Sequence, residues 1–381
     1  MAFRLRGALA AVAALPLVLA AGCAGAAGQS PPNPAVVSGS ALTGPGAGIP
    51  AGPAATPIAL SETGSTLLFP LFGAWAAAYH QAHLAVTVTT AATGSGTGIA
   101  DASAGSADLG ASDAFLSSGN LVQKPDLLNI PLAISAQQIN YNLPGLRPGV
   151  HIRLSGAVLA QMYEGVIRSW NSPAIAALNP GVSLPRTAVA PLHRAESSGD
   201  TFLFSSYLST GDPGWNARIG YGTTVAWPTA PAARGESGNG GMVTGCEAIP
   251  GCVAYIGISY LSQALSAGLG EAELQNAAGK FVLPTATSMR AAVASFVSAI
   301  PANETISMVN GPATGGYPIV NFEYAVVAAD QPTAIKARDI KAFLHWVITT
   351  GNLTQYLDQV QFQALPGPVV ALADAQIATI R

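Results

Sequence analysis

Residues 193–202 place a cation, an acid and a run of small hydroxylated residues next to one another. Arg194 offers a planar fork of N–H donors that matches the geometry of a phosphate group. Residues 198–200 come directly before the apolar run 202–208, which is typical of a helix. The first amide N–H groups of a helix have no partner within it and favour negative charge. The segment therefore predicts a helix start that binds an oxyanion.

This segment also has a simpler interpretation, in which its hydroxylated residues are ordinary N-caps and Arg194 forms a surface ion pair with Glu196. Two other turns favour the anion site. Residues 61–70 and 93–98 both combine Gly, Ser and Thr between a predicted strand and a predicted helix. Residues 94–98 fit neither the dinucleotide fingerprint nor the P-loop, because no Gly-Lys-Ser/Thr follows.

Predicted strands alternate with predicted helices from residue 57 onward, which indicates α/β domains with mixed, mostly parallel sheets. Ligands of such sheets bind beyond the carboxyl ends of the strands. All three hydroxyl-glycine turns are expected there, and so is Asp113, which ends a short strand. Their convergence favours the anion site over the simpler interpretation.

The chain is expected to cross between two lobes twice. Apolar segments 127–134 and 138–141 form the first crossing, and strand 317–327 forms the return. Residues 235–241 are expected to be a glycine-rich loop.

Residues 1–22 are typical of a secretory signal, with Arg4 and Arg6 before an apolar run shorter than the ~20 residues of a membrane-spanning helix. The run ends at Cys23 in a pattern that resembles a bacterial lipobox, although an incidental Cys after a plain signal peptide is the alternative. Residues 23–56 are rich in Ala, Gly, Pro and Ser, which predicts a flexible tether. We therefore expect a lipid anchor on the extracytoplasmic face of the cell membrane.

Composition limits the possible partners. The chain has 381 residues, 50% hydrophobic and 9% charged. Without residues 1–22 it keeps 14 of its 16 basic residues against 19 acids, a net charge of −5. This balance argues against a nucleic-acid partner. Cys246 and Cys252 predict a local disulfide in an oxidising compartment, with two free buried thiols as the alternative, and no cofactor or metal site is expected.

Four segments resemble the ligand loops of phosphate-binding proteins, which serve Pst-type phosphate ABC importers. They are residues 63–67, 93–96, 110–114, and Arg194 with 198–202. The resemblance extends from about Ser61 to the end of the chain, and is greatest to the lipoprotein form of mycobacteria and other actinobacteria. It implies a two-lobe periplasmic-binding-protein architecture of type II, with phosphate in the cleft between lobe I (57–136 plus 318–381) and lobe II (137–317).

The resemblance also implies a ligand set and a partner. The expected phosphate-binding residues are Ser65, Thr66, Leu67, Ser95, Asp113, Arg194, Ser198, Gly199 and Asp200. Delivery to the permease subunits of a phosphate importer would follow. Asp113 would accept a hydrogen bond from the proton that phosphate still carries. Sulfate has no such proton, so its binding would leave the buried carboxylate unpaired and would be weaker.

Two departures from the family pattern concern the same loops. Glu196-Ser197 stands where relatives commonly have Asp-Gly, and Glu196 is expected to orient Arg194 nevertheless. Leu67-Leu68 before Phe69 shifts an early helix aromatic, so Leu67 is expected to contribute only its backbone N–H.

Two other classes of function are alternatives to a phosphate receptor. A secreted phosphatase or serine hydrolase would need an activated nucleophile or a metal pair, and the sequence has no G-x-S-x-G and no S-x-x-K motif. A surface interaction protein could retain the fold with an idle ion site. A receptor without catalysis is the favoured interpretation.

Overall fold

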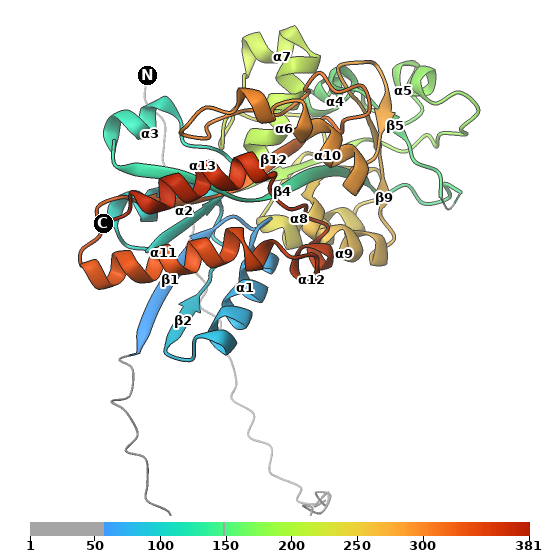
Figure 1. Cartoon of the computed structure of the whole chain (residues 1–381). Coiled ribbons are helices and arrows are strands. Elements are labelled where there is room, and N and C mark those ends of the chain that lie inside the picture. The colour runs from blue at the N-terminus through green and yellow to red at the C-terminus, as the bar shows by residue number, and fades with distance from the viewer. Residues whose placement is uncertain (1–56, 148) are drawn as a thin grey trace, which may run out of the picture. The chain divides into compact units, whose positions relative to one another are not determined.

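A computed structural model describes residues 57–147 and 149–381 (Figure 1). The predicted signal segment 1–22, Cys23 and the tether 23–56 lie outside the described residues. The strands are β1 (Ile58–Gly64), β2 (Val86–Thr89), β3 (Leu109–Ser112), β4 (Leu127–Tyr141), β5 (Arg153–Leu154), β6 (Ala190–Arg194), β7 (Arg234–Glu236), β8 (Cys252–Gly257), β9 (Gly270–Glu271), β10 (Glu273–Gln275), β11 (Phe281–Val282) and β12 (Val320–Ala328). The α-helices are α1 (Phe69–Ala82), α2 (Ser95–Ala104), α3 (Ser118–Gln123), α4 (Gly156–Tyr163), α5 (Pro173–Leu178), α6 (Gly199–Gly211), α7 (Pro213–Arg218), α8 (Gly238–Ala248), α9 (Leu261–Ser266), α10 (Ala286–Ala294), α11 (Ala334–Ile348), α12 (Thr354–Leu357) and α13 (Gly367–Ala378).

The main sheet has parallel strands at both ends and antiparallel strands in the middle. Among the described residues its order is β2-β1-β3-β12-β4-β8-β6-β7, with β9 paired to β4 off this path. β1 runs parallel to β2 and β3, and β6 runs parallel to β7 and β8. The antiparallel pairings belong to the long strands β4 and β12. β4 pairs with β12 up to Ala136 and with β8 from Gln137, so it connects the two parallel groups.

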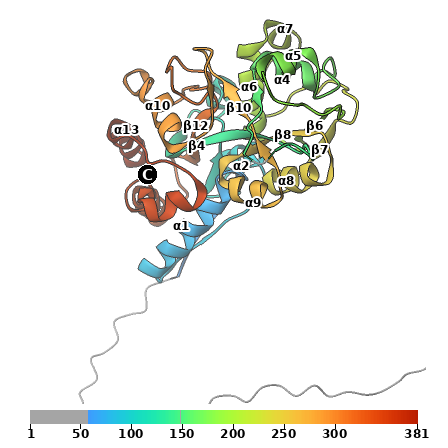
Figure 2. The same cartoon turned by 90° about the vertical axis from the view of Figure 1, so that its right-hand side faces the viewer.

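Helices flank this sheet, which confirms the α/β class. Figure 1 shows α11 and α13 alongside β4 and β12, and Figure 2 shows α8 beside β6, β7 and β8. The described residues all belong to one compact unit. The exact boundaries of the two lobes therefore stay a prediction.

One predicted loop is wrong. The glycine-rich segment 235–241 ends β7 and begins α8 at Gly238. Glycine disfavours a helix by about 1 kcal/mol relative to alanine, but here close packing offsets the cost. A Cβ at Gly245 would lie only 2.8 Å from Cδ of Glu236, so the missing side chain lets α8 approach β7.

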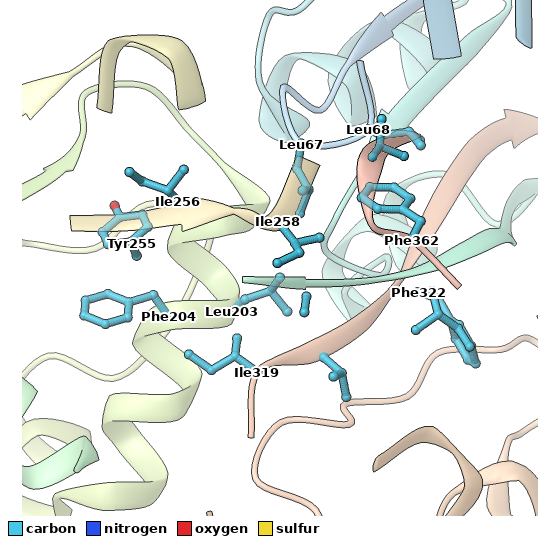
Figure 3. Packing of buried hydrophobic residues seen from close by; sticks show 14 of the residues in the cluster. Leu67, Leu68, Leu203, Phe204, Tyr255, Ile256, Ile258, Ile319, Phe322 and Phe362 are labelled. Atoms are coloured by element: carbon cyan, nitrogen blue, oxygen red, sulfur yellow. The ribbon is translucent and has the colours of Figure 1, made fainter. Parts of the chain in front are cut away.

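The apolar core extends under the loops that end the strands. Leu67, Leu68, Ile258 and Phe362 are fully buried. In Figure 3 Leu67 points toward the segment that carries Ile258, and Leu68 points toward Phe362. The turn between β1 and α1 is thus fixed by apolar contacts as well as by its hydrogen bonds. In the part of the chain that the structure describes, no helix has the length and hydropathy needed to cross a membrane.

Candidate functional site

Three strand ends lead into the turns that were predicted to bind an anion. β1 ends at Gly64, β3 ends just before Asp113, and β6 ends at Arg194. Gly64 has a φ of +144°, and a Cβ there would lie 2.1 Å from the carbonyl oxygen of Ala111. Glycine is therefore required for the chain to leave β1 so close to β3.

Asp113 is the centre of a buried group of hydroxyl donors. Its carboxylate accepts hydrogen bonds from Ser65 Oγ and, at 3.3 Å, from Ser95 Oγ. A Cβ at Gly199 would lie 2.6 Å from the Asp113 Cβ and 2.7 Å from Ser95 Oγ, so the start of α6 packs directly on this pair. Asp113 is 2% exposed. Burial raises its pKa, while hydrogen bonds from neighbouring side chains and the charge of Arg194 act in the opposite direction.

Arg194 is held by two carboxylates. Its Nε donates to Glu196 Oε1 at 2.7 Å, and its Nη1 donates to Asp200 Oδ2 at 2.5 Å. The expectation that Glu196 orients Arg194 is therefore confirmed. Burial alone would lower the pKa of Arg194. The charges of Asp200 and Glu196 outweigh this effect and raise the pKa, so the guanidinium stays charged. Burial, followed by the charge of Asp113, raises the pKa of Asp200 to about 7.

Several amide N–H groups around these side chains have no partner. Within the described residues, no hydrogen bond is donated by the amides of Thr66, Leu67, Ser95, Gly199 and Thr201. The amide of Ser198 donates to Thr223 O at 2.8 Å, and that of Asp200 donates to Ser198 Oγ at 3.1 Å. Of the three amides predicted at the α6 start, that of Gly199 is therefore available to a ligand, and the amide of Thr201 adds one that was not predicted.

Asn239 is a site residue that the sequence analysis missed. Its Nδ2 donates to Thr66 Oγ1 at 2.9 Å and to Asp200 Oδ2 at 2.8 Å, while its Oδ1 accepts from Gly257 N at 2.7 Å. It lies in the first turn of α8, which was predicted as a loop. The Gly-Asn-Gly-Gly sequence at 238–241, another small-residue turn before an apolar run, was the signal that could have identified it.

Gln137 was also missed. Its Nε2 donates to the carbonyl oxygen of Asp200 at 2.9 Å and to Asp200 Oδ1 at 3.1 Å. The residue begins the part of β4 that pairs with β8, so the crossing strand contributes directly to the site.

The structure brings all nine predicted binding residues into one buried region. Ser65, Thr66, Ser198 and Asp200 are each at most 4% exposed. The side chain of Leu67 packs against Gly257, and its carbonyl oxygen accepts from Ser259 Oγ at 2.7 Å, so only its backbone N–H is left for a ligand.

Two further predictions concern a disulfide and a metal site. Cys246 and Cys252 form a disulfide, with their Cα atoms 5.3 Å apart. Among the described residues there is no cluster of three or more His, Cys, Asp or Glu side chains that could hold a metal ion.

Comparison with known proteins identifies the family. Residues 51–350 match the PBP superfamily domain. The phosphate-binding protein PstS of Xylella fastidiosa is 31% identical over 322 residues, which cover 84% of this chain and 85% of that protein. The chain belongs to the PstS family. Among its relatives is phosphate-binding protein PstS 3 of Mycobacterium leprae, 30% identical over 82% of this chain and 85% of that protein.

Solved structures confirm the predicted two-lobe binding-protein fold. The phosphate binding protein from Stenotrophomonas maltophilia superimposes with a TM-score of 0.62 at 19% identity, covering 84% of this chain and 93% of that one.

Proposed function

We propose that this PstS-family protein is an extracytoplasmic receptor that binds inorganic phosphate and delivers it to an ABC permease, without catalysis. Its family membership supports the ligand class, because the relatives reported above are named phosphate-binding proteins. The single most informative observation is the buried carboxylate of Asp113, which accepts hydrogen bonds from two serine hydroxyl groups and packs against Gly199 at the start of α6.

The ligand would be held mainly by neutral donors. The amides of Thr66, Leu67, Ser95 and Gly199, with the Ser65 and Ser95 hydroxyl groups, would donate to the phosphate oxygens. Ser198 and Asp200 shape the start of α6. Arg194 would add charge-assisted donation once its contacts with Glu196 and Asp200 adjust.

Asp113 would select the protonated oxyanion. HPO₄²⁻ and H₂PO₄⁻ can each donate a hydrogen bond to this carboxylate, whereas sulfate cannot. A bound sulfate would leave a buried carboxylate facing an anion without a proton between them.

The cell-surface location is part of the same proposal. The order of signal run, small residues and Cys23 supports a lipid anchor. The Cys246–Cys252 disulfide is consistent with an exported protein, since such bonds persist in oxidising compartments.

Calorimetric titration of the exported domain tests the proposal. At the ligand-efficiency limit of about 1.5 kcal/mol per non-hydrogen atom, phosphate can bind with a dissociation constant of about 1–10 μM. We expect binding in this range and sulfate binding at least ~100-fold weaker, because the unpaired carboxylate costs about 3 kcal/mol. No heat of phosphate binding at millimolar concentration would contradict the receptor function.

A further inference from the structure

The sheet register places a second carboxyl group beside Asp113. β12 and β3 are antiparallel, with Tyr324 opposite Ser112. Glu323 and Asp113 are the residues next to this last pair, and β12 has an irregularity between Glu323 and Tyr324. The two carboxyl groups lie within hydrogen-bonding reach of each other.

Glu323 is fixed by neutral donors on one oxygen only. Its Oε1 accepts from Ser135 Oγ at 2.5 Å and from Asn321 Nδ2 at 3.0 Å. Asn321 Nδ2 also donates to the carbonyl oxygen of Asp113 at 3.2 Å, which joins the two residues. The other oxygen, Oε2, is buried and receives no hydrogen bond from the described residues. One oxygen of Glu323 is thus left for Asp113.

Two carboxyl groups in contact need a proton between them, because ionised carboxylates only accept hydrogen bonds. Glu323 is 0% exposed. Burial and then the charge of Asp113 hold the pKa of Glu323 well above its usual range. Burial also raises the pKa of Asp113, and Glu323 is the largest of the effects that oppose this rise.

Other ionisable groups around the pair act on its charge. Arg194 of β6 faces Asp113 and stabilises its ionised form, while Asp200 of α6 opposes it. Tyr324, next to Glu323 on β12, has a raised pKa and stays neutral. The proton of the pair therefore belongs on Glu323, because the charge of Arg194 favours the ionised form of Asp113.

We propose that Glu323 keeps its proton and donates it in a hydrogen bond to Asp113, and so acts as a positioning residue for the carboxylate that recognises phosphate. The inference rests on the proposed function and deepens it. The donated hydrogen bond would keep Asp113 ionised and fix its orientation, so that a lone pair points at the proton of the ligand. It would also limit the charge of the pair to that of one carboxylate.

Infrared spectroscopy of the phosphate-free protein tests the contact itself. At about pH 8, where ordinary carboxyl groups are ionised, the difference spectrum between wild type and Glu323→Gln should contain the C=O stretch of a protonated carboxyl. Asp113→Asn should shift this band. Glu304 is a matched control, since it is 0% exposed and burial raises its pKa to about 8. The C=O band of Glu304 can be identified from the difference spectrum between wild type and Glu304→Gln. This band should keep its frequency in Asp113→Asn.

Phosphate titration tests the positioning role. Glu323→Gln keeps an N–H donor for Asp113 and should bind phosphate within about threefold of wild type, whereas Glu323→Ala should lose about tenfold or more, the effect of one hydrogen bond of about 1.5 kcal/mol. Glu304→Gln should bind like wild type.

The outcomes separate the two claims. A missing Glu323 band, or one that does not respond to Asp113→Asn, would overturn the inference even if phosphate binds. If Glu323→Gln binds phosphate as weakly as Glu323→Ala does, the positioning role is overturned. A normal Glu323 band in a protein that binds no phosphate would instead contradict the proposed function.

Discussion

At the scale of single residues, the site that we propose for an anion has a surplus of negative side chains. Arg194 contacts both Glu196 and Asp200, and Asp113 adds a further carboxylate. One cation cannot balance these acids, so a bound oxyanion must depend on neutral N–H and O–H donors. The pKa of about 7 for Asp200 means that part of this charge is lost near neutral pH.

Asn239 connects these charges to Thr66, and its removal should be costly. Asn239→Ala would leave the buried amide of Gly257 without its Asn239 acceptor and would remove one of the two donors to Asp200 Oδ2, the other being Arg194. We expect the free energy of unfolding to fall by about 1–3 kcal/mol, measured by urea denaturation. The exposed Asn303, replaced by Ala, should change it by less than ~0.5 kcal/mol. Equal stability of both variants would show that the Asn239 contacts contribute little.

At the scale of elements, the helix starts could be predicted because their turn chemistry is local. The Gly/Ser/Thr turns before α1, α2 and α6 are visible in the sequence, and so is the strand end at Asp113. The start of α8 was missed because packing of Gly245 on Glu236, a tertiary contact, overrides the low helix propensity of glycine. The proximity of Glu323 to Asp113 was missed for a similar reason, since it depends on the pairing of β12 with β3.

Gly199 is the residue through which the start of α6 packs against Asp113 and Ser95. In Gly199→Ala, the added methyl group would overlap Asp113 and Ser95 and push α6 away from β3. We expect phosphate affinity to drop by at least ~10-fold and stability to fall by about 1–3 kcal/mol. Gly73→Ala is the control, because it lies within α1 with open space around its Cβ and should stabilise the protein by about 0.5–1 kcal/mol. Wild-type phosphate affinity in Gly199→Ala would contradict the packing argument.

At the scale of the whole described domain, the site is formed by contacts between the two parallel groups of strands. Gly96 N donates to Ser197 O at 3.3 Å, and Asn239 reaches Thr66. Since the predicted ligand residues are almost fully buried, an ion can enter only if such contacts open. The crossing strands β4 and β12 are the covalent links that remain, which makes them the expected hinge of a closing motion.

The central claim is that Asp113 recognises a protonated oxyanion, and it belongs to the domain as a whole because both strand groups build its environment. The most direct test is the ratio of sulfate to phosphate dissociation constants in wild type and in Asp113→Asn, measured by calorimetry at one pH. We predict a ratio of at least ~100 in wild type, reduced at least ~10-fold in the variant, because an amide can donate to sulfate as well as accept from phosphate. An unchanged ratio would contradict the account.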